Sequence, residues 1–300
     1  MFRVERIIVD TDIGSDPDDA LAIALAMKSP EIIIEGITIV NGDIEHKARM
    51  AHKILSLGEC SGVRVIPGIS NSLLKNRTLY ANGQEGEGFM SPDDTTIFDG
   101  HAVDFIIEKV MNNPGEISLV AIGPLTNIAA AMIREPKISR KLKRIYLMGG
   151  VTGKGDHYID LPQVEYNIKC DPEAASVVFS SGTSILMVGL DVTMKLMLTK
   201  EMLGQIKNKN TPLNDVLAGI VKRWLTFIGE EATPMHDPLA LALVINPNLV
   251  KTQRMNVAVE YSHNRSSGKT VASPDQNGHV SVACLVNEKQ FFELLLSRLA

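Results

Sequence analysis

Short apolar runs alternate with longer helical patterns along most of this chain, and this alternation restricts its fold more than any other feature. The runs are rich in β-branched residues and lack polar alternation, which is typical of strands buried on both faces of a sheet. Helical patterns between consecutive strands predict a parallel sheet with crossover helices. The expected strands are residues 6–9, 32–40, 63–66, 117–122, 145–148 and 185–190, and the expected helices are residues 20–27, 44–57, 102–111, 128–134 and 172–180.

The character of the sequence changes after Asp191. A mostly helical stretch is expected to about residue 244, followed by short antiparallel strands at 255–261, 270–272 and 279–286 and a helix at 288–299. No linker-like or low-complexity tract separates this part from the rest. We therefore expect a single domain over residues 1–300, with a doubly wound, mostly parallel, Rossmann-like α/β sheet and a C-terminal helical and antiparallel elaboration.

The charge balance, the cysteines and the lack of a long apolar stretch limit the binding partners and the location that we expect for this protein. Thirty Lys and Arg against 35 Asp and Glu leave a net charge of −5, which offers no basic field to nucleic acid or anionic lipid. Three distant cysteines fit neither a zinc site nor a disulfide framework. No uncharged stretch has membrane-spanning length. The sequence predicts a cytoplasmic protein that binds neither nucleic acid nor membrane.

An acidic cluster follows the first expected strand. Five carboxylates, Asp10, Asp12, Asp16, Asp18 and Asp19, lie within ten residues. Packed together at the edge of a sheet, they would repel one another and raise some of their pKa values. A hard divalent cation with oxygen ligands, Ca²⁺ or Mg²⁺, removes this repulsion. The cluster therefore predicts a cation site.

Helix capping is the alternative interpretation of the same residues. Asp16 as the N-cap residue, followed by a proline and an acidic first turn, makes a good helix start. This interpretation accounts for three of the five carboxylates and leaves Asp10 and Asp12 unexplained.

Polar residues elsewhere in the chain are expected to converge on the same edge of the sheet. Asn41 and Thr126 follow expected strands, although a turn and a helix N-cap would also explain them. Glu165 and Asn167 lie in an expected irregular segment and are suited to gripping hydroxyl groups, with loop solvation as the alternative.

A histidine and an aspartate precede the apolar run at residues 239–244. Asp237, followed by a proline, is suited to capping a helix. Capping gives no reason for the adjacent His236, and histidine is the usual proton donor near neutral pH.

Taken together, these motifs resemble the inosine-uridine type nucleoside N-ribohydrolase family, from residue 7 to about residue 299. The resemblance implies the nucleoside hydrolase fold and the Ca²⁺-dependent hydrolysis of ribonucleosides to ribose and a free purine or pyrimidine base, in nucleoside salvage. It also suggests a homodimer or homotetramer. The blocks are Asp10-Thr11-Asp12, Asp18-Asp19-Ala20, Asn41, Gly123-Pro124-Leu125-Thr126-Asn127, Met148-Gly149-Gly150, Glu165-Tyr166-Asn167, Asp171-Pro172-Glu173-Ala174-Ala175 and His236-Asp237-Pro238.

The metal ligands implied by the resemblance are three carboxylates and one main-chain carbonyl. Asp12 and Asp19 resemble side-chain ligands of a tightly held Ca²⁺, and Asp237 and the carbonyl of Thr126 complete the set. Asp12 is also implied to be the general base for a calcium-bound water. Asp10 corresponds to a position that supports the metal site from behind.

The remaining roles implied by the resemblance concern the substrate. Asp18 and Asn167 resemble the residues that grip the ribose 2′- and 3′-hydroxyls, with Asn41 beside them. Glu165 would hold the 5′-hydroxyl, and His236 would protonate the leaving base. The chemistry agrees, because an N-glycosidic bond breaks through an oxocarbenium-like state that carboxylates stabilise.

The chain departs from the common family pattern in three places. Ile13 replaces a proline, and the acidic loop is two residues longer, so Asp16 also competes for a ligand position. Asn82 stands where many members have histidine, and Ile159 where purine-accepting members often have asparagine. These changes affect substrate binding and leave the residues of the metal chemistry in place.

The base preference stays open at the level of the sequence. Base contacts are expected from residues 75–99, a candidate mobile loop, and from residues 223–236. There, Trp224 and Phe227 would either stack on the base or anchor a helix.

Two rival functions stay open as well. A haloacid-dehalogenase-like Mg²⁺ phosphatase would use Asp10 as its nucleophile. A catalytically lapsed Ca²⁺-dependent nucleoside or sugar binding module would keep the residues without the turnover.

Overall fold

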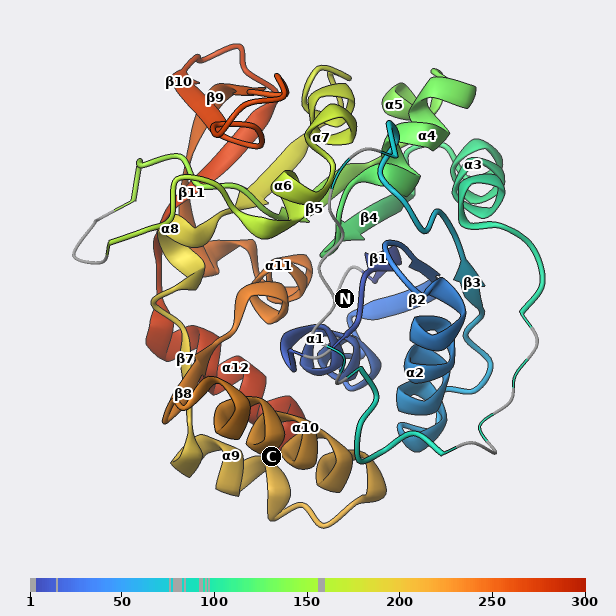
Figure 1. Cartoon of the computed structure of the whole chain (residues 1–300), viewed down its shortest axis with the longest axis vertical. Coiled ribbons are helices and arrows are strands. Elements are labelled where there is room, and N and C mark those ends of the chain that lie inside the picture. Colours follow the sequence, from blue (N-terminus) through green and yellow to red (C-terminus); the bar gives the residue numbers. More distant parts are fainter. Residues whose placement is uncertain are drawn as a thin grey trace.

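A mostly parallel sheet occupies the centre of the computed structural model, which describes residues 4–14, 16–75, 77, 83, 85–91, 94, 96, 98–155 and 160–300 (Figure 1). Across these residues the sheet has nine strands, in the order β10-β9-β11-β6-β5-β4-β1-β2-β3. The first six strands of the chain lie next to one another in the order β3-β2-β1-β4-β5-β6, and every pair of neighbours among them is parallel. Their bounds are β1 Glu5–Thr11, β2 Ile32–Ile39, β3 Val65–Pro67, β4 Ile117–Ala121, β5 Arg144–Met148 and β6 Ile185–Val188.

This strand order confirms the doubly wound fold and indicates where a ligand binds. The chain reverses its direction of growth between β1 and β4, so the loops after these two strands diverge to opposite faces of the sheet. In open α/β sheets the resulting crevice, at the carboxyl ends of the strands, is the usual ligand site.

Helices cover both faces of the sheet, and each central strand contributes to two hydrophobic cores. On β1, Ile7 and Val9 belong to one core and Ile8 to the other, because successive side chains of a strand point to opposite faces. The first core includes α1, α2 and α10 to α12, and the second α3 to α5 and α7. The helices are α1 Asp18–Met27, α2 Ile44–Leu57, α3 Ala102–Asn112, α4 Thr126–Arg134, α5 Ile138–Lys141, α6 Tyr166–Cys170, α7 Pro172–Phe179, α8 Leu190–Thr193, α9 Lys200–Lys207, α10 Pro212–Ile228, α11 His236–Ile245, α12 Glu288–Leu299 and the short 3-10 helix Pro247–Leu249.

The C-terminal strands continue the main sheet. β9 (Val250–Val259) pairs antiparallel with β10 (Thr270–Pro274) and β11 (Val280–Val286), as expected. β11, however, also pairs parallel with β6 and thereby joins this group to the parallel strands. A two-stranded pair, β7 (Met197–Thr199) and β8 (Ala232–Pro234), interrupts the stretch expected to be helical. Strands of three residues are too short for a periodic signal.

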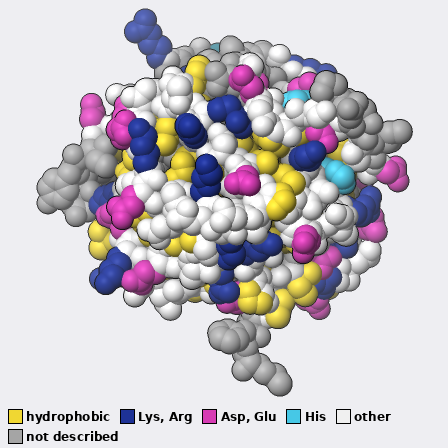
Figure 2. Space-filling model, turned by 90° about the horizontal axis from the view of Figure 1, so that it is seen from below, with side chains coloured by type: hydrophobic (Ala, Val, Ile, Leu, Met, Phe, Trp, Pro, Cys, Tyr) yellow, Lys and Arg dark blue, Asp and Glu magenta, His cyan; other side chains and the backbone are white. Residues whose placement is uncertain are grey.

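The surface carries charges of both signs. On the face shown in Figure 2, acidic and basic side chains are interspersed with small apolar areas, in keeping with the small net charge of −5. Among the described residues, no helix combines the length and the apolar character needed to cross a membrane.

The helix α11 offers a test of the first core. It is apolar around its whole circumference, which is typical of a helix buried on all sides, and Leu241 has no exposed surface. We expect Leu241→Ala to lower the free energy of unfolding by about 2–5 kcal/mol, measured by urea denaturation. Ile133→Ala is the control, since Ile133 is 59% exposed and surface changes usually stay within about 0.5 kcal/mol. Equal losses in the two variants would contradict the placement of α11.

Candidate active site

A cavity of about 480 Å³ opens at the carboxyl ends of the parallel strands. It lies at the switch point expected to hold a ligand. Its lining includes the β1–α1 loop, the start of α6 and the start of α11, together with side chains from α2, α8, α10 and the ends of β4 and β5. The residues singled out in the sequence that line it together are Asp12, Asp16, Asp18, Asp19, Glu165, Asn167, Trp224, His236 and Asp237.

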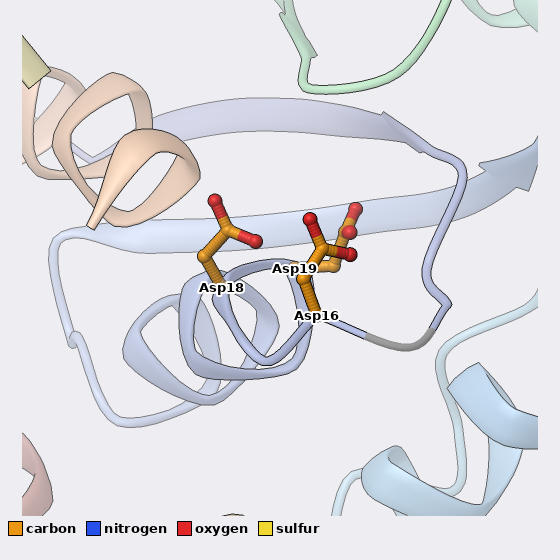
Figure 3. A group of neighbouring side chains, drawn as sticks. All are labelled: Asp16, Asp18 and Asp19. Atoms are coloured by element: carbon orange, nitrogen blue, oxygen red, sulfur yellow. The ribbon is translucent and has the colours of Figure 1, made fainter. Parts of the chain in front are cut away.

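Three carboxylates at the start of α1 form the densest acidic group. Oxygen atoms of Asp16, Asp18 and Asp19 all lie within 4.8 Å of one another, and Figure 3 shows the three side chains grouped at the start of the helix. Asp18 and Asp19 are buried in the first turn, whereas Asp16 is exposed at the cavity. Oxygen-only donor sets of this kind suit a hard cation such as Ca²⁺ or Mg²⁺.

Three of the expected N-cap residues, Asp16, Thr126 and Asp237, do not cap their helices. The N-cap residue of α1 is Pro17, without a side-chain hydrogen bond, so the expected N-cap role of Asp16 is wrong. The same holds at α4, where Leu125 stands at the N-cap position, and at α11, where Met235 does. The expected N-cap roles of Thr126 and Asp237 are therefore wrong as well.

Burial and repulsion raise the pKa values of this group. Burial, followed by repulsion from the neighbouring carboxylates, raises the pKa of Asp18, Asp19 and Asp237 well above the ordinary value. Asp16 lies in a recess whose walls displace bulk water, and this desolvation together with the charge of Asp12 raises its pKa to about 6. Such shifts mark a place where the charged forms need a counter-ion.

Asp12 is held in place by neighbours on three sides. Asn41 Nδ2 donates to its Oδ2 at 3.3 Å, and Lys47 Nζ donates to its main-chain carbonyl at 2.5 Å. The same Nζ lies 4.0 Å from Oδ2. A Cβ on Gly123 would stand 2.8 Å from the Asp12 nitrogen and 2.9 Å from Oδ1, so only glycine allows this approach. Sequence reasoning missed Lys47, whose signal is its place in the first turns of the helix after β2.

Asp10 lies behind Asp12 and is fully buried. Its Oδ1 accepts hydrogen bonds from Thr38 Oγ1 at 2.5 Å and from Asn127 Nδ2 at 2.9 Å, while its Oδ2 has no partner. Burial raises the pKa of Asp10 to about 7, partly offset by these two hydrogen bonds. Asn127 also donates to the carbonyl of Ile39, so this network fastens β1 to β2 beneath the cavity.

Asn167 lies in α6 rather than in the irregular segment expected, whereas Glu165 precedes the helix in extended backbone. Glu165 is the N-cap residue of α6 and accepts from the backbone N–H groups of Gly150, Asn167 and Ile168 at 2.7–3.0 Å. Burial raises its pKa, and these hydrogen bonds oppose the shift. Asn167 Nδ2 donates to the carbonyls of Ile122 and Met148. Its Oδ1 accepts no hydrogen bond from the described residues and is suited to a ligand hydroxyl.

Thr126 lies outside the group that lines the cavity. Its hydroxyl donates to Asp171 Oδ2 at 2.7 Å, and the other carboxylate oxygen of Asp171 caps α7 at Ala174 N. The side chain of Thr126 thus fastens α4 to α7. The role implied for its main-chain carbonyl stays a prediction.

His236 and Asp237 open α11 at the edge of the cavity. His236 Nδ1 is 2.7 Å from Thr193 Oγ1, and burial lowers the pKa of His236 to about 4. The imidazole is therefore neutral near pH 7. The backbone N–H of Asp237 donates to Asp18 Oδ2 at 3.4 Å, which joins the start of α11 to the start of α1.

The opposite wall contains an aromatic side chain and part of residues 75–99. Trp224 lines the cavity, and its indole N–H donates to Thr233 Oγ1 at 3.1 Å. Phe227 is 51% exposed and does not act as an apolar anchor. Glu85 also lines the cavity, and its carbonyl is 2.8 Å from His46 Nε2. Asn82 and Ile159, the two departures from the family pattern, lie outside the described residues.

Comparisons with known proteins agree on one family. The family model described as inosine-uridine preferring nucleoside hydrolase matches residues 7–293. A relative from Escherichia coli O1:K1 / APEC, named pyrimidine-specific ribonucleoside hydrolase RihB, is 35% identical over 89% of this chain and 86% of its own.

Two solved structures are similar over 98% of both chains. The plant nucleoside hydrolase PpNRh1 superposes with a TM-score of 0.87 at 29% identity. A purine-preferring ribonucleoside hydrolase from Gardnerella vaginalis superposes with a TM-score of 0.86 at 31% identity.

The raised pKa values predict that cation binding releases protons. Groups whose pKa is raised are partly protonated at neutral pH in the cation-free protein, and a cation displaces those protons. We therefore expect Ca²⁺, added to chelator-treated protein near pH 6.5, to release protons and to bind more tightly as the pH rises. Calorimetric titration in two buffers of different ionisation enthalpy measures the number released. The control is the same titration near pH 9, where the carboxyl groups are largely ionised. Equal proton release at both pH values would contradict the shifts.

Proposed function

This chain belongs to the inosine-uridine preferring nucleoside hydrolase family, and from that premise we propose that it hydrolyses the N-glycosidic bond of ribonucleosides with Ca²⁺ as its cofactor. As a member of the family, it is a hydrolase that acts on N-glycosyl compounds. The observation that carries the proposal is the cavity at the switch point. Carboxylates from the β1–α1 loop and from α11 meet there beside acceptors suited to a ribose.

The proposed ligands of the cation are Asp12, Asp19, Asp237 and the carbonyl of Thr126. The residues fit a hard cation because carboxylate oxygens of Asp16, Asp18 and Asp19 lie within 4.8 Å of one another and Asp237, which is 4% exposed, lines the same cavity. Oxygen-only donors of this kind suit such a cation. When bound, the cation supplies Lewis acidity, which makes water a competent nucleophile at neutral pH.

Asp12 is the proposed general base. Its carboxylate faces the cavity and is held by Asn41 and the nearby ammonium of Lys47, so it is oriented before substrate arrives. It takes the proton of the attacking water at a carboxylate oxygen. Such prior orientation removes part of the entropic cost of the reaction.

The ribose is proposed to bind through Asp18 and Asn167, with Asn41 beside them. Asp18 is an acceptor for one vicinal hydroxyl, and Asn167 Oδ1 is an acceptor for the other. Glu165 is proposed to hold the 5′-hydroxyl. Its two oxygens already accept three backbone N–H bonds, which leaves lone pairs for one further donor. The negative charge around the sugar favours the positive charge that develops on the ring.

His236 is proposed to donate a proton to the leaving base. Its lowered pKa means that the imidazole of the unliganded protein is neutral. The imidazole is therefore proposed to take up a proton from solvent as the complex forms and to pass it to the base when negative charge develops there during bond cleavage. The hydrogen bond to Thr193 fixes the orientation of the ring.

The substrate is proposed to be a ribonucleoside in nucleoside salvage, without a commitment to one base. The named relatives differ, one being pyrimidine-specific and one purine-preferring. Trp224 lines the cavity and offers an aromatic face to either type. Three unpaired cysteines agree with a cytoplasmic location. A homodimer or homotetramer is part of the proposal and is measured by sedimentation.

The phosphatase alternative is disfavoured by the position of Asp10. That reaction needs Asp10 as an accessible nucleophile. Asp10 is fully buried, is bonded to Thr38 and Asn127, and is not among the described residues that line the cavity. Its environment agrees instead with support of the cation site.

Reducing-sugar release from inosine, uridine, cytidine and adenosine tests the proposed reaction. We expect wild-type protein to release ribose, a chelator to abolish release, and Ca²⁺ to restore it. Asp12→Asn should lose at least about 10³-fold in kcat, since a positioned acid or base contributes about 10²–10⁴-fold. Asp215→Asn on α10 is the control for loss of one negative charge. Binding without turnover would support the lapsed module, and phosphate release from a phosphomonoester would support the phosphatase.

His236→Ala tests the protonation of the leaving base. We expect turnover of purine nucleosides to fall by about 10²-fold or more, the scale of a general acid. Turnover of a nitrophenyl riboside should change little, because its leaving group departs without help. Thr193→Val should lower the turnover of purine nucleosides by less than His236→Ala does. Its turnover of the nitrophenyl riboside should again change little. Equal losses of the two substrates in His236→Ala would rule out the role.

A further inference from the structure

Asp16 lines the cavity, and neither the family resemblance nor helix capping accounts for it. It stands in the β1–α1 loop, which is two residues longer than the common family pattern. Pro17 takes the N-cap position of α1 without help from the Asp16 side chain. The carboxylate therefore does not stabilise the start of the helix.

The geometry of the neighbouring oxygens fits a shared ion. An oxygen of Asp16 lies within 4.8 Å of oxygens of Asp18 and Asp19 (Figure 3). Ca²⁺ binds oxygen at about 2.3–2.6 Å, so two of its ligands are at most about 5 Å apart. The three oxygens can thus lie around one cation without rearrangement of the backbone.

A carboxylate from another part of the chain lines the same cavity. Asp237, at the start of α11, is 4% exposed. Its backbone N–H donates to Asp18 Oδ2 at 3.4 Å, so the start of α11 lies against the start of α1. Carboxylates from two helix starts therefore line one cavity, and a hard cation with oxygen ligands would offset their repulsion.

The protein supplies only part of the counter-charge. Lys47 contacts the carbonyl of Asp12 at 2.5 Å, and its charge lowers the pKa of Asp16 by less than desolvation and the charge of Asp12 raise it. Within the described ranges, no ion pair reaches Asp16, Asp18 or Asp19. A bound cation would neutralise the negative charge that Lys47 leaves uncompensated.

We propose that Asp16 is an additional ligand of the divalent cation, contributed by the lengthened β1–α1 loop, and that it favours Ca²⁺ over Mg²⁺. The inference rests on the proposed function, which places a cation in this cavity. Ca²⁺ accepts six to eight oxygen ligands in flexible geometry, whereas Mg²⁺ demands a near-ideal octahedron and keeps several waters. A further carboxylate therefore increases the affinity for Ca²⁺ more than the affinity for Mg²⁺.

Calorimetric titration of chelator-treated protein tests the inference without measuring catalysis. We expect Asp16→Asn to raise the dissociation constant of Ca²⁺ at least about 10-fold and that of Mg²⁺ less than about threefold, because charge count and ligand number tune these sites. Glu85→Gln is the matched control. It removes one negative charge from the same cavity, lies outside the carboxylate group, and should change the Ca²⁺ dissociation constant by about twofold or less.

Thermal melting separates a ligand from a residue that only stabilises the fold. Without cation, Asp16→Asn should melt at a higher temperature than wild type, because one repelling charge is gone. With Ca²⁺, its melting temperature should rise less than that of wild type, because a weaker ligand stabilises less. A merely structural Asp16 would lower the cation-free melting temperature instead.

Two results would overturn the proposal. The first is an unchanged Ca²⁺ dissociation constant in Asp16→Asn. The second is an equal loss of Ca²⁺ affinity in Asp16→Asn and Glu85→Gln. That result would mean that Asp16 acts on the cation only through its charge at a distance. If wild-type protein does not bind Ca²⁺ at all, the proposed cofactor and this inference both fail. If wild type and Asp16→Asn bind Ca²⁺ equally well, only this inference fails.

Discussion

Repulsion among carboxylates buried at the end of β1 is the constraint on which the rest of this structure depends. Asp18 and Asp19 lie in the first turn of α1, beneath the cavity, where desolvation disfavours their charged forms. In the absence of a counter-ion, such groups relieve the repulsion by taking up protons. Neither residue caps α1, and the proposed cation would offset the repulsion that keeping them together entails.

The order of the strands brings these charges together with groups that are distant in sequence. β1 lies at the switch point, next to both β2 and β4, so the carboxyl ends of these three parallel strands lie side by side. Asn41 comes from the end of β2 and approaches Asp12, while Gly123 after β4 leaves room for it. α11 packs on α1, and the backbone N–H of Asp237 donates to Asp18 Oδ2, which holds the start of α11 against the start of α1. Each member of the site is therefore positioned by the end of a regular element.

The sheet and its two helical layers could be predicted from the sequence because buried parallel strands leave uninterrupted β-branched runs, as β1, β4 and β5 do. The site was less predictable, because helix capping and cation binding use the same residue types. Asp16 and Asp237 stood next to prolines and satisfied every rule for N-caps, yet neither caps its helix. Only the three-dimensional structure distinguishes the two uses. Lys47 gave no sequence signal stronger than that of any helical lysine.

The cavity places opposite electrostatic demands on its two ends. At the end proposed to hold the ribose, the carboxylates of Asp12 and Asp18 would favour a sugar that becomes positive. At the other end, burial keeps His236 neutral in the unliganded protein, so its proposed role as an acid requires that it first take up a proton. The first end is built from the starts of α1 and α11, which are fixed by the sheet. The second end contains Trp224 from α10 and Glu85 from a surface segment. Surface segments vary in sequence more readily than the edge of a sheet. This division accounts for a family in which relatives named for different bases share one fold.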